Sequence, residues 1–156
     1  MPTIERVWQD LAKASFAVVG YVTPAGEPRS SGVVYVTSGR RMYVAVGADS
    51  WKAQHIELTG QVAVSVPVRR GGLMSLMFPI PPATISFHAT AIVHPAGALE
   101  EGPMTQALAR LIPPERRAQC RVIEIQPVGD FVTYGEGVSL MRMRTPALAR
   151  GRVPAG

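Results

Sequence analysis

The feature that most constrains the fold of this chain is a series of short apolar, β-branched stretches separated by turn residues instead of long helices. The first three are joined by the tight turns 24–27 and 38–40, so we expect them to form an antiparallel meander. Strands that follow one another this closely favour a closed or partly closed antiparallel barrel over a parallel α/β sheet. We therefore expect a mainly β protein of about seven strands: 16–22, 31–37, 42–46, 61–66, 83–94, 121–126 and 129–134.

Two or three short helices are expected beside the sheet. Ile4, Val7 and Leu11 recur at helical spacing, which predicts a helix that ends near Ala14. Further helices are predicted over 50–58, where Thr59-Gly60 would end the helix, and over 99–111, before two prolines.

The length of 156 residues fits one domain, because it allows a good core and stays short of the length at which cores split. We expect this domain over 1–145 and a C-terminal tail over 146–156, where Gly, Pro and widely spaced Arg leave little periodicity. The long irregular segment 67–82 is expected to be functional or interfacial. Its apolar part, 73–80, is too short to cross a membrane and is interpreted as a subunit interface or a pocket lid.

The charge and cysteine content limit the partners and the compartment. A net charge of +5 favours anionic ligands, but the arginines are spread along the chain and aromatic residues are only 6%, so a dedicated nucleic-acid role is not expected. The single cysteine, Cys120, forms no intramolecular disulfide and fits a reducing compartment. With no leader and no apolar run of roughly 20 residues, we expect a cytoplasmic protein without membrane contact.

The stretch 44–56 predicts a binding site for a phosphate. It resembles a strand that ends in a small-residue turn and passes directly into a helix, so that Ser50 and Lys52 lie in the first helical turn. Free backbone N–H groups and the helix dipole favour an anion there, and a hydroxyl and an ammonium can complete its shell. The alternative is an ordinary helix cap, with Asp49 or Ser50 accepting backbone N–H bonds and Lys52 solvated.

Other familiar chemistry is not indicated. His88 and His94 would stand about 20 Å apart on one strand, and His55 is isolated, so no metal site is expected. The chain lacks a G-x-S-x-G elbow, and it also lacks the Walker and G-x-G-x-x-G fingerprints. The sequence thus shows no obvious catalytic cluster.

The order of these elements resembles the pyridoxamine 5′-phosphate oxidase-like family, the flavin-binding split β-barrels with Greek-key connections. The resemblance covers roughly residues 5–95: a Gly26-Glu27-Pro28 turn, a strand, a hairpin, a second strand, Ser50-Trp51-Lys52, a helix and an apolar strand. It implies that Ser50 and Lys52 hold the phosphate of a cofactor, with Trp51 where Arg is common. The strand residues that it places beside the cofactor are Arg29, Ser31, Gly32, Val33, Val44, Ala45 and Val46.

The chain departs from the true oxidases at these strands. Ser31 stands where they carry an arginine, although Arg29 is nearby, and Ala45-Val46 replaces their Tyr-Thr pair. The C-terminal Arg152-Val153-Pro154 is similar to their substrate-binding arginine motif.

The resemblance implies an oxidoreductase that uses flavin mononucleotide (FMN) or the deazaflavin F420 and transfers a hydride to an unidentified small molecule. It also implies a homodimer with the cofactor site between the subunits, and 73–80 and Trp51 are the expected shared surface. A non-catalytic carrier of flavin or haem is the alternative, with His88 as the expected haem ligand.

Overall fold

The computed structural model of this chain describes residues 2–70, 76–77, 80–97, 103–109, 111–139 and 141–156. None of the helices in these segments is long and apolar enough to cross a membrane. The elements, in chain order, are α1 (Ile4–Lys13), β1 (Phe16–Val22), β2 (Pro28–Ser38), β3 (Arg41–Gly47), α2 (Trp51–Thr59), β4 (Gln61–Val68), β5 (Ala83–Val93), α3 (Pro103–Ala109), α4 (Pro114–Arg117), β6 (Cys120–Tyr134), η3 (Arg142–Arg144), α5 (Pro146–Ala149) and β7 (Arg150–Pro154).

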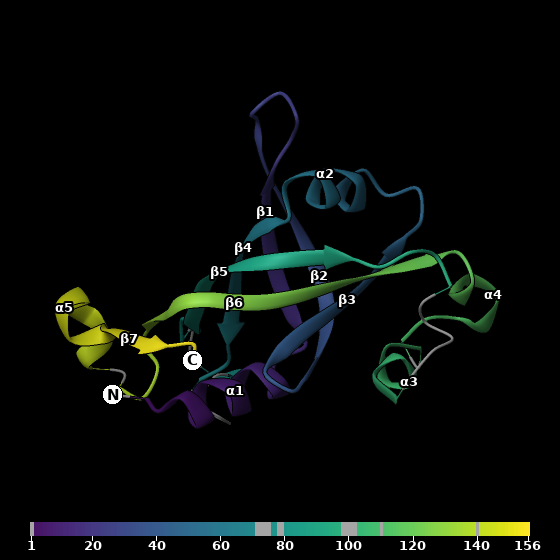
Figure 1. Cartoon of the computed structure of the whole chain (residues 1–156). Helices are drawn as coiled ribbons and strands as arrows, with labels where there is room; N and C mark the ends of the chain where they lie inside the picture. The colour runs from purple at the N-terminus through teal and green to yellow at the C-terminus, as the bar shows by residue number, and fades with distance from the viewer. Residues whose placement is uncertain (1, 71–75, 78–79, 98–102, 110, 140) are drawn as a thin grey trace.

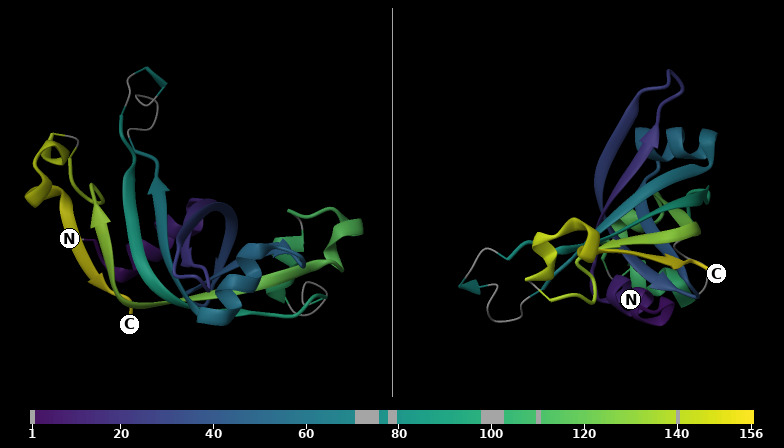
Figure 2. Two further views of the ribbon diagram at one scale, coloured as in Figure 1. Left: turned by 90° about the horizontal axis from the view of Figure 1, so that it is seen from above. Right: turned by 90° about the vertical axis from the view of Figure 1, so that its left-hand side faces the viewer.

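The strands form a split antiparallel barrel, which confirms the expected fold class. Their order is β3-β2-β1-β4-β5-β6-β7, and β3 also pairs with β6, so the first six strands close into a ring and β7 lies outside it. Strands β1, β2 and β3 make the predicted meander, and β4 returns beside β1, as in a Greek key. Figures 1 and 2 show β6 running the length of the molecule, from α4 at one end to α5 at the other.

Alternate residues of the strands fill the barrel, and α1 covers one of its ends. Val7 and Leu11 of α1 are fully buried. The fully buried ring of Phe131 lies edge-on to the rings of Phe87 and Trp8, with ring centroids 5.2 Å and 5.7 Å away. The helix is therefore part of the core and not an accessory on the surface.

The two strands expected over 121–126 and 129–134 are one continuous strand, and this prediction was wrong. The Pro-Val-Gly sequence that suggested a turn forms a β-bulge within β6. Between the pairs Ser86↔Val132 and His88↔Val128 the register against β5 shifts, and Gly129 takes a φ of 73°, which favours glycine. The turn residues thus bend the strand instead of ending it.

The segment expected to be an irregular tail contains regular structure. Residues of β7 pair with β6 from Arg150↔Tyr134 to Pro154↔Asp130, which makes β7 the seventh strand of the sheet. A five-residue strand between a short helix and the chain end is too brief for a pattern of alternation to reveal it.

Candidate functional site

A cavity opens at the place where β2 and β3 part. The two strands pair only from Tyr35↔Val44 to Ser38↔Arg41, and beyond Tyr35 and Val44 they diverge. The cavity beside this split has a volume of about 280 Å³. It is lined by four predicted site residues, Gly32, Val33, Ala45 and Lys52, and by Val34, Leu108, Leu111 and Ile112.

The start of α2, which contributes Lys52 to the cavity, has no side-chain cap. Ser50 is the N-cap residue, yet its side chain makes no capping hydrogen bond. The first N–H groups of an α-helix have no partner inside the helix. The turn itself is fixed by its backbone, because Ser50 N–H donates to Gly47 O (3.0 Å) and Ala48 N–H donates to Gln119 O (2.8 Å). The alternative of a side-chain cap therefore does not describe this helix.

Because Ser50 makes no capping bond, its replacement is expected to cost little stability. We expect Ser50→Ala to change the free energy of unfolding by less than about 0.5 kcal/mol, against about 1 kcal/mol for a working cap. Thr3 is the matched control, since its Oγ1 accepts a hydrogen bond from Arg6 N–H at the start of α1 (3.3 Å). Urea unfolding of Ser50→Ala and Thr3→Ala checks this, and a larger loss in Ser50→Ala would restore the capping role.

Lys52 is a partly buried cation at the start of α2. None of the ion pairs among the described residues includes it. Burial lowers the pKa of its ammonium, because removal from water disfavours the charged form. An anion placed in the cavity would relieve that penalty, so the donor set here fits a phosphate or another small anion.

The position of α2 is secured at its other end. Arg121 at the start of β6 donates two hydrogen bonds to the carboxylate of Glu57, at 3.0 and 2.8 Å, and a third to His94 O. The helix also packs against β1 and β5. The first turn of α2 is thereby held at a fixed place beside the split.

The other predicted site residues are spread around this cavity. Val44 and Val46 point into the barrel core. Arg29 is exposed and pairs with Glu27 (2.8 Å), and it does not line the cavity. Ser31 precedes Gly32 on β2. Trp51, adjacent to Lys52, is 72% exposed, with its ring 5.9 Å from that of His55.

Sequence reasoning missed the wall that closes the cavity from the side of α3. Leu108, Leu111 and Ile112 form it, and α3 packs against β2 and β3. Leu108 lies in α3, and Leu111 and Ile112 follow its end, and no local signal in the sequence tells which strands these side chains will cover.

A broad trough lies on the outer face of the sheet beside the cavity. It has a volume of about 750 Å³ and crosses β1, β4, β5, β6 and β7. His88, exposed on β5, also lines it. Residues that are paired across neighbouring strands lie on the same face of the sheet. One series of such cross-strand partners runs from the cavity to the trough: Gly32, Val18, Ser65, Ser86, Val132 and Arg152.

Gly32 stands at the junction of cavity and trough, where a larger residue would require the half-exposed Phe16 side chain to move. A Cβ at this position would come within 2.8 Å of the Phe16 ring. The 73–80 segment, expected as interface or lid, lies largely outside the described residues; Leu76 and Met77 are exposed. Within the described part of the chain, no cluster of three His, Cys, Asp or Glu side chains suitable for a metal is found.

The fold and the cavity define the class of this protein as a split β-barrel with a cavity beside the split. No protein-family model matches the chain, and no curated protein matches its sequence. Solved structures do match it in shape. A putative pyridoxamine 5′-phosphate oxidase from Listeria innocua is 15% identical, with 80% of this chain and 92% of that chain covered and a TM-score of 0.60.

Two further structures extend the comparison. An F420 reductase is 18% identical, with 78% and 92% of the two chains covered and a TM-score of 0.58. The haem storage protein HutZ from Vibrio cholerae is 15% identical, with 86% and 96% covered and a TM-score of 0.60. This chain therefore has the fold of the pyridoxamine 5′-phosphate oxidase-like split barrels, a fold that serves proteins described by different ligands.

Proposed function

We propose that this protein is an FMN- or F420-dependent oxidoreductase that transfers a hydride to a small molecule. The observation that carries the proposal is Lys52, a partly buried cation that has no ion-pair partner among the described residues. It lines a cavity at the barrel split, next to a helix start without a side-chain cap. The fold shared with a putative pyridoxamine 5′-phosphate oxidase and an F420 reductase supports it.

The residues of this chain would bind and shield the cofactor. Lys52, the Ser50 hydroxyl and the first N–H groups of α2 would hold its phosphate. Gly32 and Ala45 leave room beside the strands, and the leucine and isoleucine side chains from α3 onward exclude water. When bound, the cofactor itself supplies the hydride chemistry, so the protein needs no side chain as acid or base.

We further propose a homodimer whose shared surface includes the trough and Trp51. The trough is open, and Val18 and Val132 on its surface are 37% and 39% exposed. Apolar surface of this kind commonly marks contact sites. The series of cross-strand partners from Gly32 to Val132 would bring the second subunit to the edge of the cofactor cavity. We place the protein in the cytoplasm, because the lone Cys120 suits a reducing compartment.

A non-catalytic flavin or haem carrier is the second candidate. It is favoured by His88, which lies exposed on the apolar trough, where its imidazole is free to ligate an iron. The common fold with a haem storage protein supports this candidate as well.

Analysis of the bound molecule separates these functions. We expect freshly purified protein to release FMN or F420 on denaturation, identified by its mass, or to bind one of them when it is added. Reduction of bound FMN by NAD(P)H, seen as bleaching of its absorption, would support the enzyme, whereas a Soret band would support the haem carrier. Failure to bind either FMN or F420 would contradict the proposed oxidoreductase.

A further inference from the structure

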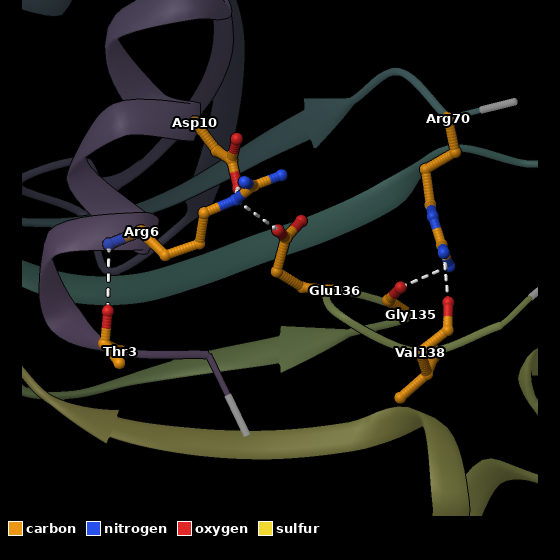
Figure 3. Close-up of polar contacts among 7 residues, drawn as sticks. All are labelled: Thr3, Arg6, Asp10, Arg70, Gly135, Glu136 and Val138. Carbon is orange, nitrogen blue, oxygen red and sulfur yellow. Dashed lines mark hydrogen bonds and ion pairs between the residues drawn. The ribbon is translucent and has the colours of Figure 1, made fainter. Parts of the chain in front are cut away.

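Two carboxyl side chains are buried together where α1 meets the turn after β6. Asp10 on α1 is 4% exposed and Glu136 is 6% exposed. The side chain of Asp10 lies close enough to that of Glu136 to raise its pKa. Figure 3 shows both carboxyl groups pointing toward the guanidinium of Arg6, in the space between the helix and the turn. Neither residue lines the cavity or the trough, so the proposed function leaves this pair unexplained.

Few positive charges face this pair. Arg6 on α1 has its Nε 3.0 Å from Asp10 Oδ2 and 3.9 Å from Glu136 Oε1. Arg70, after β4, approaches from the other side, but its guanidinium donates to the backbone oxygens of Gly135 and Val138. The charged groups acting on the pair from the packed elements are thus Arg6 and Arg70 alone among the described residues.

One mostly exposed arginine in direct contact cannot neutralise two buried carboxylates. Two like charges in contact inside a protein disfavour the doubly ionised state, so the pair retains one proton. Burial and the neighbouring Asp10 raise the pKa of Glu136 to about 7. The protonated Glu136 O–H then donates to the Asp10 carboxylate, while Arg6 balances the remaining charge.

We propose that the Asp10–Glu136 pair is a proton-operated latch that fastens α1 to the turn between β6 and the C-terminal elements. With the proton in place the latch is closed. Once the proton is lost, two carboxylates repel each other and the latch loosens. Arg70 keeps the turn itself in place through Gly135 and Val138, so it is the docking of α1 that responds.

The direction of the pH effect follows from Glu136. Its pKa is higher in the folded protein, about 7, than its ordinary value of 4.5, so the folded state binds the proton more tightly. The stability that this proton contributes is complete below about pH 4.5 and is lost as the pH rises through about 7. We expect the ratio of folded to unfolded protein to fall about tenfold or more over this range.

Trp8 provides a direct readout, because it lies on α1 with its ring 5.7 Å from that of Phe131 on β6. In a Trp51→Phe background it is the only tryptophan of the chain. We expect quenching of its fluorescence by iodide to rise between pH 5 and pH 9, with a midpoint near 7. Glu136→Gln, which stays neutral, is expected to keep quenching low throughout.

Glu27→Gln is the matched control, since Glu27 is exposed and its one ion pair among the described residues is with Arg29. It is expected to leave the transition unchanged. Asp10→Asn removes the same repulsion from the helix side and replaces Glu136→Gln if that variant does not fold. A flat quenching profile in the parent protein, or an unchanged transition in the folded carboxyl variant, would overturn the latch.

Discussion

Lys52→Ala is expected to weaken binding of the FMN or F420 cofactor by about 10- to 150-fold. The substitution removes a charge-assisted contact worth about 1.5–3 kcal/mol, and 1.4 kcal/mol corresponds to a factor of ten. Lys52 lines the cavity, and burial lowers the pKa of its ammonium. Cofactor binding to the parent protein should therefore begin to weaken at a lower alkaline pH than it would with an ordinary lysine, because the Lys52 ammonium loses its proton earlier. Titration calorimetry at two pH values measures both effects.

The chain offers an unusually clean control for this experiment. It contains only one other lysine, Lys13, which is exposed in the last turn of α1. Lys13→Ala makes the same change in net charge and should leave cofactor affinity unchanged. Equal affinity of the parent protein and Lys52→Ala for both cofactors would remove Lys52 from the binding site.

Phe131→Ala is expected to destabilise the protein by about 3–5 kcal/mol, the range for truncation of a buried aromatic side chain. Phe131 is fully buried, and its ring contacts two others, those of Phe87 and Trp8. The cavity left behind would lie between the barrel and α1, where the helix limits collapse. Urea unfolding measures the loss, and the melting temperature should fall by roughly 10 °C.

Val132→Ala is the matched control on the neighbouring position of β6. Its side chain points outward and is 39% exposed, so the cost of its truncation should stay below about 1 kcal/mol. A loss of less than about 1 kcal/mol in Phe131→Ala would mean that α1 adjusts to fill the space, and the role of this ring in the core would have to be revised.

Local patterns predicted most of the elements. Turn residues and β-branched stretches predicted β1 to β5 close to their observed bounds. The predicted stop of the helix after Ser50 also agrees with the structure, where the cap residue Gly60 has a left-handed φ of 65° that suits glycine. The bulge at Gly129 was misinterpreted, because the same residue types form turns and bulges. The difference lies in the partner strand, which no local window contains.

The candidate site was predictable on one side only. The stretch that contains Ser50 and Lys52 carries its own geometry, a strand end followed by a helix start, so it was found from residue types and spacing. The wall made by Leu108 and Ile112 depends on where α3 packs, and that is decided by tertiary contacts. Asp10 and Glu136 gave no signal either, because single acidic residues in an ordinary sequence suggest solvent exposure.

The ring closure between β3 and β6 has a consequence for how this protein is made. It brings together residues as far apart as Arg41 and Glu124, which are separated by 83 positions. Bringing such distant residues together costs loop-closure entropy before the contacts that stabilise the pairing have formed. The pairing of β3 with β6 is therefore expected near the end of folding. During synthesis on the ribosome, the first three strands therefore emerge before β6, and the edge of β3 is left unpaired. Until β6 is made, that edge is expected to be open to pairing with another chain, and rapid folding or a chaperone would prevent this.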